Sequence, residues 1–185
     1  MLAVEVSGCT RCPLAGGRTQ TVFGMGNPGA DLVFVGEGPG AEEDKQGLPF
    51  VGRSGQLLDR LVLEELGLTR DHWYVANVVK CRPPGNRDPL PDEIEMCRPY
   101  LDRQLELISP RVVVTLGNFA TKLLLGTSEG IRKVRGRAYP WRDGIVIVPT
   151  YHPAAVLRGG GQTMAEMRAD LVRAKLALAG AAAGA

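Results

Sequence analysis

The sequence lacks long apolar runs, a large net charge and internal repeats. No stretch approaches the roughly 18 consecutive apolar residues of a membrane-spanning helix, and residues 1–10 have neither the basic segment nor the apolar run of a signal peptide. We therefore expect a cytoplasmic protein without a membrane partner. The formal net charge of +2 does not by itself indicate any class of partner.

The chain has enough apolar residues to bury a full core. Of its 185 residues, 44% are apolar and 23% are charged, and a chain of this length more often forms one domain than two. We expect one globular domain over residues 1–185 that acts as a monomer. The final segment, AGAAAGA at 179–185, has no polar or bulky side chain, and we expect it to be disordered.

Four cysteines are present. Thiols stay reduced in the cytoplasm, so these residues are better candidates for metal binding or chemistry than for disulfide bonds. Four unrelated buried thiols are the alternative, which is disfavoured because all four lie near Gly, Pro or Arg rather than inside apolar runs. Sets of four cysteine ligands suit zinc and iron–sulfur clusters alike, so their spacing leaves the metal open. The cysteines are Cys9, Cys12, Cys81 and Cys97.

Short apolar runs alternate with segments of helical periodicity. The apolar runs are rich in β-branched residues, which is typical of strands buried on both faces. They span residues 31–36, 73–79, 111–117 and 144–150. The helical segments span 54–67, 92–108, 118–125 and 164–178. This alternation predicts an α/β fold, a three-layer α/β/α sandwich around a central four-stranded parallel sheet.

Two loops are basic. Residues 131–142 hold five cations and no acid, with Tyr139 and Trp141 among them, and the loop at 80–87 adds three more cations. Most charged runs are solvated faces, yet basic loops with interleaved aromatics can follow a phosphate backbone, and we favour nucleic acid over the solvated face. The cations are Arg132, Lys133, Arg135, Arg137 and Arg142 in the first loop, and Lys80, Arg82 and Arg87 in the second.

The segment GEGPGA at 36–41 matches the dinucleotide-binding fingerprint and follows a predicted strand. Two features argue against a pyrophosphate there. Three carboxylates at 42–44 would lie at the helix N-terminus and repel it, and Pro39 removes one amide donor. The loop instead suits a neutral or amide-bearing group, held by the backbone and by Glu37 or Glu43.

Three side chains are candidates for a ligand site, which α/β proteins form at the carboxyl ends of their strands. His152 follows a strand directly, Asn77 lies inside an apolar strand, and Phe50 lies in a glycine-bounded loop. Each has a structural alternative: a core histidine, an internal hydrogen-bonding amide, and an aromatic cap on the core.

Three segments together resemble the signature segments of the family 4 uracil-DNA glycosylases. They are GEGPGAEEDKQGLPFVGRSGQLLD, NVVKCRPPGNRDPLPDE and HPAAVLR, and the resemblance extends from Cys9 to the last helix. It implies an enzyme that flips uracil out of single- or double-stranded DNA and hydrolyses its N-glycosidic bond, leaving an abasic site. It also implies that the four cysteines hold a 4Fe-4S cluster.

The resemblance carries roles for individual residues. In the uracil pocket, which includes Gly38, Phe50 stacks on the base, Asn77 bonds its O4 and N3 edge, and His152 donates to O2. Water activation falls to Glu37 or Glu43, because the aspartate that some relatives place in the first motif is absent. The DNA-binding residues that we expect are Pro153, Val156, Leu157 and Arg158, together with Arg82, Arg87 and Arg135.

Two rival functions remain open. A non-catalytic iron–sulfur or zinc DNA-binding module would keep the cysteines and the basic loops, but it would have no need of Phe50, Asn77 and His152 at the strand ends. A glycosylase with broader specificity for deaminated bases would keep all of these features.

Overall fold

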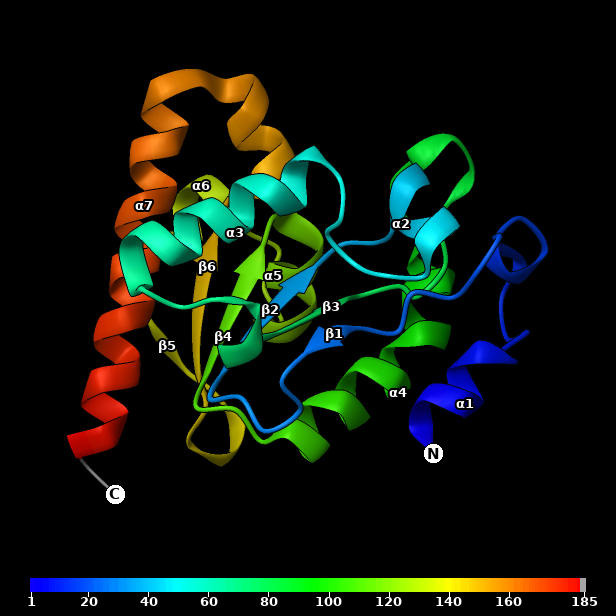
Figure 1. Ribbon diagram of the computed structural model, residues 1–185, viewed down its shortest axis with the longest axis horizontal. Coiled ribbons are helices and arrows are strands. Elements are labelled where there is room, and N and C mark those ends of the chain that lie inside the picture. The colour runs from blue at the N-terminus through cyan, green and yellow to red at the C-terminus, as the bar shows by residue number, and fades with distance from the viewer. Residues whose placement is uncertain (184–185) are drawn as a thin grey trace.

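Four buried strands form the centre of the structure, a computed structural model that describes residues 1–183. They are β2 (Leu32–Gly36), β3 (Tyr74–Asn77), β4 (Val112–Leu116) and β6 (Val146–Thr150). Adjacent strands in this group run parallel, in the order β3-β2-β4-β6, which confirms the predicted parallel sheet. Every residue of β2, β3 and β4 is buried, because helices cover both faces (Figure 1).

Two short antiparallel strands extend the sheet to six. β1 (Met25–Gly26) pairs with β3 at one edge, and β5 (Tyr139–Pro140) pairs with β6 at the other. The sequence pattern predicts neither strand. Each spans two residues, which is too short to show an alternating pattern, and Pro140 is tolerated because β5 is an edge strand.

One face of the sheet is covered by α3 (Arg53–Leu66), α6 (Ile131–Val134) and α7 (Pro153–Ala183). The apolar side chains of α3 recur at helical spacing and pack in one core cluster with α7 and the strands. Helix α3 ends at Gly67, whose φ of 74° provides the left-handed cap that a side chain would disfavour.

The opposite face carries α1 (Leu2–Ser7), α4 (Pro91–Ile108) and α5 (Asn118–Leu125), which form a second core cluster. The three layers are therefore helices, sheet and helices, as predicted. The remaining short elements are η1 (Pro13–Gly16), α2 (Ala41–Gln46), η2 (Arg70–His72), η3 (Pro84–Asn86) and η4 (Arg142–Gly144).

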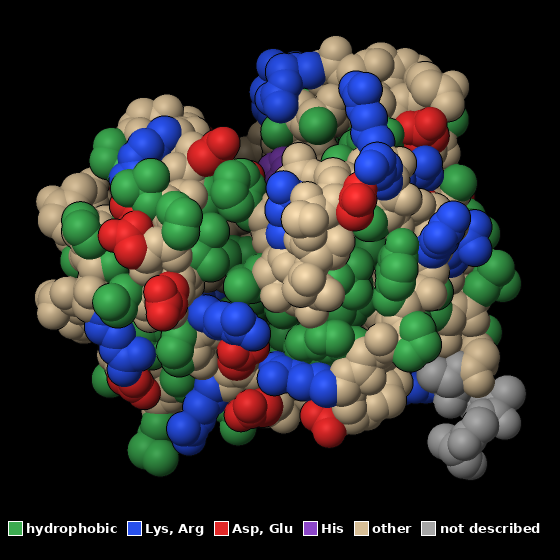
Figure 2. All heavy atoms as spheres, turned by 180° about the vertical axis from the view of Figure 1, so that it is seen from behind, with side chains coloured by type: hydrophobic (Ala, Val, Ile, Leu, Met, Phe, Trp, Pro, Cys, Tyr) green, Lys and Arg blue, Asp and Glu red, His purple; other side chains and the backbone are tan. Residues whose placement is uncertain are grey.

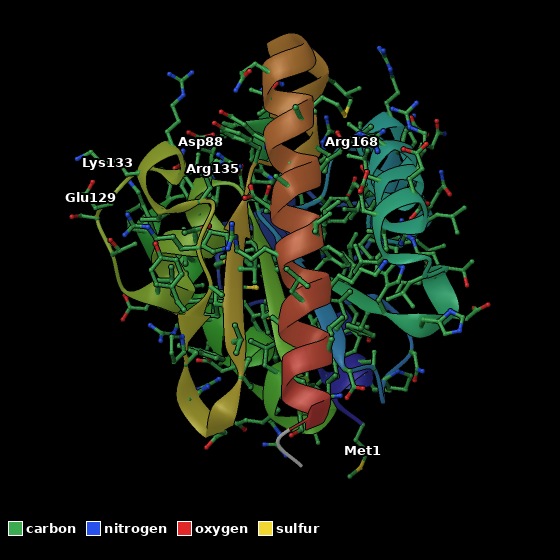
Figure 3. All side chains as sticks on the ribbon, turned by 90° about the vertical axis from the view of Figure 1, so that its left-hand side faces the viewer. Met1, Asp88, Glu129, Lys133, Arg135 and Arg168 are labelled. Carbon is green, nitrogen blue, oxygen red and sulfur yellow. The ribbon has the colours of Figure 1, made fainter. Side chains whose placement is uncertain are left out.

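Helix α7 differs most from the sequence-based expectation. It begins at Pro153 rather than near residue 164, it kinks at Gly160, and it lies between α3 and β6 (Figure 3). It continues to Ala183, so helix replaces most of the disordered tail expected over 179–185; residues 184–185 lie outside the described part. Neither α7 nor any other helix within residues 1–183 combines the length and apolar character that crossing a membrane requires.

Candidate functional site

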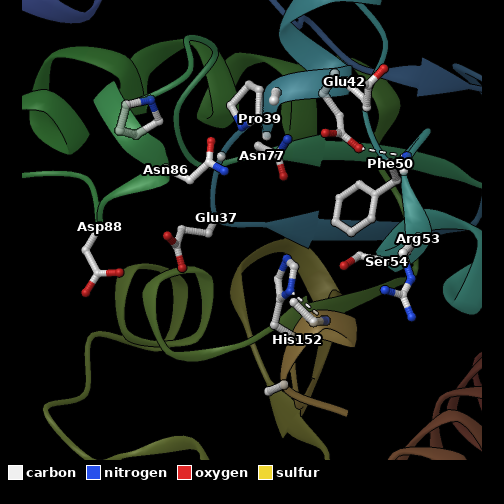
Figure 4. A pocket seen from close by; sticks show the side chains of 18 of the residues that line it. Glu37, Pro39, Glu42, Phe50, Arg53, Ser54, Asn77, Asn86, Asp88 and His152 are labelled. Carbon is white, nitrogen blue, oxygen red and sulfur yellow. Dashed lines mark hydrogen bonds between the residues drawn. The ribbon is translucent and has the colours of Figure 1, made fainter. Parts of the chain in front are cut away.

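A cavity of about 590 Å³ opens where β2, β3 and β6 end. In the space-filling view a hollow near the top of the molecule exposes a histidine side chain (Figure 2). The structure brings the predicted catalytic and uracil-binding residues together in this cavity, as the rule for parallel sheets requires. Those that line it are Glu37, Gly38, Glu43, Phe50, Asn77 and His152 (Figure 4).

Asn77 is the last residue of β3, and its side chain is almost fully enclosed. The residue is 2% exposed, and in the described part of the chain its Oδ1 atom has no hydrogen-bond partner. A Cβ atom at Gly36 on the neighbouring strand would lie 2.5 Å from this Oδ1, so only glycine leaves the amide room. An unpaired buried acceptor carries a desolvation cost of roughly 1 to 3 kcal/mol, which a donor on a bound ligand would remove.

His152 presents a hydrogen-bond donor to the cavity. Its Nδ1 atom accepts the backbone N–H of Ala154 at 3.2 Å. Burial, and then the charge of Arg158, lowers the pKa of His152 to about 4, so the ring is neutral at pH 7. With Nδ1 acting as the acceptor, the proton of the neutral ring is on Nε2.

Phe50 is held in a left-handed backbone conformation, with a φ of 54°. Its carbonyl oxygen accepts a hydrogen bond of 2.7 Å from Arg70. A Cβ atom at Gly55 would lie 1.8 Å from the same oxygen, so the first turn of α3 closes over this loop only because residue 55 is glycine. The loop is fixed from two sides, which places the aromatic ring against the cavity.

The two glutamates proposed from the sequence have different surroundings. Glu43 accepts the backbone N–H groups of Val51 and Gly52 at 3.1 and 3.0 Å, so its carboxylate holds the Phe50 loop. Glu37 is partly exposed and extends toward Asp88 (Figure 4). Burial, and then the charge of Asp88, raises the pKa of Glu37 to about 7. Glu37 is therefore the stronger candidate for handling a proton.

Sequence reasoning missed several residues at the cavity rim. Asn86 and Asp88 come from the loop after β3, and Arg53 and Ser54 come from the start of α3. The motif NVVKCRPPGNRDP contained the signal for the first two, because a polar loop after a buried strand lies at the ligand-binding edge. Asn86 also accepts a 2.7 Å hydrogen bond from the predicted DNA-binding residue Arg82.

The predicted DNA-contacting segment at the start of α7 divides between surface and core. Arg158 lines the cavity and is exposed, and Leu157 is 44% exposed. Val156 is 2% exposed and packs in the core cluster, while Pro153 is buried as the first residue of the helix. The burial of Val156 disfavours a role as a wedge between bases and leaves Leu157 for it.

Several of the predicted basic residues are paired with acids. Arg135, with a side chain 15% exposed, makes two hydrogen bonds of 2.8 and 2.9 Å to the buried carboxylate of Asp170. Arg87 makes a similar two-bonded pair, at 2.9 and 2.6 Å, with the buried Glu93. A phosphate would have to displace these carboxylates, which argues against the expected DNA contacts of Arg135 and Arg87.

The exposed part of the 131–142 loop is also partly neutralised. Lys133 pairs with Glu129 at 2.7 Å, a pair labelled in Figure 3, and Arg142 pairs with Asp102 at 3.2 Å. The basic run therefore presents less free positive charge than its sequence indicates.

All four cysteines line a second, much smaller cavity. Two come from the N-terminal segment around η1, Cys81 follows β3, and Cys97 lies on α4. Backbone N–H of Lys80 donates to Cys97 Sγ at 3.2 Å, and Arg18 donates to Cys81 Sγ at 3.3 Å. Such donors stabilise thiolates, the form that binds metals. Within residues 1–183, no three Cys, His, Asp or Glu side chains form a group that could hold a single metal ion.

Comparison with known proteins agrees with this geometry. The family model described as Uracil DNA glycosylase superfamily matches residues 23–174. A type-4 uracil-DNA glycosylase of Sulfurisphaera tokodaii is 51% identical over 83% of this chain and 73% of its own length. Those of Saccharolobus solfataricus and Thermotoga maritima are each 48% identical over 85% of this chain, and over 76% and 82% of their own lengths. The chain therefore belongs to the uracil DNA glycosylase superfamily and, within it, to the type-4 uracil-DNA glycosylases.

Proposed function

We propose that this chain removes uracil from DNA by hydrolysing the N-glycosidic bond, leaving an abasic site. The observation that carries the proposal is the unpaired Oδ1 of the buried Asn77, in a cavity that also receives the N–H donor of a neutral His152. The names of the type-4 relatives support the same activity. The reaction is that of a DNA-repair hydrolase.

Asn77 would read the Watson–Crick edge of a flipped base. Its carbonyl oxygen accepts from uracil N3–H, and its NH₂ group donates to O4. A base inside a duplex cannot reach the buried Asn77, so the nucleotide must turn out of the stack. Phe50, fixed by Arg70 and the turn at Gly55, would offer its ring as a stacking surface.

His152 would stabilise the departing base. Cleavage of the bond between C1′ and N1 leaves the electron pair on uracil, and part of the resulting negative charge lies on O2. A donor fixed in advance at that oxygen lowers the barrier without reorganisation. Because His152 is neutral and its Nδ1 bonds to the Ala154 amide, its Nε2–H is available for this bond.

Glu37 would accept a proton from the attacking water as the water oxygen bonds to C1′. A pKa of about 7 keeps a large fraction of this carboxyl ionised at neutral pH and makes it a competent base. Glu43 holds the loop that carries Phe50, so we assign it a structural part and leave water activation to Glu37.

Arg158 and Leu157 would meet the DNA next to the cavity. Arg158 lies at the cavity rim, where a phosphate flanking the flipped nucleotide would lie, and the exposed Leu157 precedes it. An apolar side chain inserted at the vacated position compensates part of the lost stacking. Arg82, in the loop after β3, would add positive charge, whereas the pair that Arg87 makes with the buried Glu93 argues against a phosphate contact at Arg87.

The four cysteines would hold a 4Fe-4S cluster. They surround one cavity, and the donors from Lys80 and Arg18 fit bound thiolates. When bound, the cluster supplies a covalent clamp between the N-terminal segment, the loop after β3 and α4. Those cysteines thereby fix the loop that carries Arg82 relative to Asn77.

One assay separates the candidate functions. The protein is incubated with an oligonucleotide that contains a single uracil, and the DNA is then treated with alkali, which breaks the strand at abasic sites. We expect a break at the uracil in single- and double-stranded substrates, and none where thymine replaces it. Binding without any break would identify a non-catalytic module. Equal breakage at hypoxanthine would identify a glycosylase of broader specificity.

A further inference from the structure

Lys80 is a buried lysine that lies between the cysteine cavity and Asn77. It is 1% exposed. Its backbone N–H donates to Cys97 Sγ at 3.2 Å, and its Nζ donates to the backbone carbonyl oxygen of Asn77 at 2.8 Å. One residue thus contacts both the cysteine site and the main chain of the residue that would read uracil.

Gln104 on α4 orients the Lys80 side chain. The Nε2 of Gln104 donates to the carbonyl oxygen of Phe23 at 2.9 Å and to the Tyr74 hydroxyl at 3.3 Å, so its Oε1 faces Lys80 and accepts from Nζ. The amine therefore bonds to two neutral oxygens. Burying an amine costs desolvation free energy, and an apolar side chain of similar length would fill the same space without that cost. The presence of lysine at this position therefore indicates that its hydrogen bonds matter.

The carbonyl group of Asn77 depends on this amine. Beyond the end of β3 the chain still follows β2, because Val78 N–H donates to Gly36 and Val79 N–H donates to Glu37. The Asn77 carbonyl takes its hydrogen bond from the Lys80 side chain instead. Without that donor the oxygen would be buried and unpaired, and only the bond from Val78 N–H to Gly36 would hold the peptide group that follows Asn77.

We propose that Lys80 is a positioning residue for uracil recognition. By fixing the Asn77 carbonyl, it fixes the direction in which the Asn77 side chain enters the cavity, while its backbone bond to Cys97 ties that position to the cysteine site. The proposal rests on the proposed function of the cavity. It extends that function, because Lys80 is not among the residues that line the cavity.

The test compares Lys80→Met, which keeps the length but removes the donor, with Lys122→Met at an exposed position on α5. Four quantities are measured: the single-turnover rate of uracil release at saturating enzyme, the inhibition constant of free uracil, which reports the base pocket alone, the DNA half-saturation and the iron content. We expect the Lys80 variant to lose about 10- to 100-fold in rate, as misplacement of a reacting group by about 1 Å can cost. The uracil inhibition constant should rise by a similar factor, with DNA half-saturation and iron content unchanged.

A partly misfolded protein would behave differently, because it would need more total enzyme to reach saturation but would release uracil at the wild-type rate once saturated. That result overturns the proposal, as does a wild-type rate combined with a wild-type uracil inhibition constant. If Lys80→Met yields no folded protein, Gln104→Leu provides the test, since it removes the group that orients Nζ. We expect Gln104→Leu to slow uracil release and to raise the inhibition constant of free uracil. Wild-type values of both quantities would overturn the proposal. Absence of uracil release by the wild type would instead refute the proposed function.

Discussion

The rings of Phe50 and His152 lie side by side in the cavity, with centroids 5.8 Å apart and planes tilted by 31°. The two side chains come from segments about a hundred residues apart in the sequence, the loop before α3 and the turn after β6. They form one continuous wall, so a base stacked on Phe50 would have an edge close to the imidazole. Mutation of Phe50 therefore tests stacking on the base, and mutation of His152 tests stabilisation of the departing base.

Replacing His152 by Ala should lower the single-turnover rate of uracil release by roughly 100- to 1,000-fold. This corresponds to about 2.7 to 4 kcal/mol, the effect of removing one preorganised donor in other enzymes. DNA binding should change little. His72→Ala is the matched control, because His72 lies in η2, is exposed and bonds to Thr69. Equal rates for the two variants would assign His152 a structural part only.

The raised pKa of Glu37 predicts two pH effects. The rate should increase with pH through about 7 as the carboxylate forms, and Glu37→Gln should abolish this rise. The pKa of Glu37 is about 7 in the folded state and has its ordinary value of 4.5 in the unfolded state. At a pH between these two values, Glu37 keeps its proton in the folded state and releases it in the unfolded state, so the free energy of unfolding falls as the pH rises across this window.

Glu37→Gln should therefore be more stable than the wild type at pH 8, and this advantage should disappear at pH 4, as measured by urea denaturation at both pH values. Glu42→Gln, at the exposed part of the same cavity, is the control. A stability difference that is the same at pH 4 and pH 8 would contradict the assignment of a raised pKa to Glu37.

Asn77→Asp should change which base is accepted. The carboxyl group accepts from the N4–H₂ of cytosine and, when protonated, donates to cytosine N3, whereas it no longer matches the O4 and N3–H pattern of uracil. We expect loss of most uracil release, by up to roughly 10⁴-fold, and slow cytosine release from mismatches, where flipping is easiest. Asn77→Ala should lose uracil release without gaining cytosine release. Full uracil activity in the aspartate variant would place the base-reading residue elsewhere.

Arg158 and Arg135 should respond differently to neutralisation. If Arg158 meets a phosphate, Arg158→Gln should reduce the slope of log affinity against log salt by about 0.9. Arg135→Gln should leave this slope unchanged and destabilise the fold by about 3 to 5 kcal/mol, because Asp170 would remain buried without its partner. DNA titrations at several salt concentrations and urea denaturation test the pair. A reduced slope for Arg135→Gln would restore its predicted DNA contact.

The cysteine site predicts metal content. Protein purified without oxygen should be brown, with about four iron and four sulfide per chain, as one cluster bound by four cysteines requires. Cys97→Ser should lower the iron content, while Ser7→Ala, at an exposed position of the same N-terminal region, should not. Zinc in place of iron would exclude the cluster.

The sequence predicted the parallel sheet because its four central strands are buried on both faces and therefore read as unbroken apolar runs. It also indicated His152 as a candidate, since strand ends mark the binding edge of such a sheet, and Asn77, as an amide inside an otherwise apolar run. It could not predict the role of Arg135, because the partner Asp170 lies 35 residues further along the chain. The same limit applies to Val156, whose burial depends on how α7 packs against α3.

The sequence predicts the start of α7 near residue 164 because three successive glycines, Gly159, Gly160 and Gly161, are typical of a loop. In the structure only Gly160 leaves the helical conformation. Tertiary packing of the flanking turns overrides the low helix propensity of the other two glycines.

Gly160 adopts a φ of 74° and a ψ of −162°, a combination essentially restricted to glycine, and so divides α7 into two helical parts at a kink. The longer part is secured by Met167, Leu171 and Ala174 in the core, whereas the short part carrying Leu157 and Arg158 contributes Val156 alone to the same cluster and lies beside the cavity. Opening of the short part does not require melting of the longer part, so the two have different local unfolding free energies. Amide hydrogens at 155–159 should exchange with solvent well before those around 167–174, and the segment that carries Leu157 and Arg158 can change shape while the longer part stays folded.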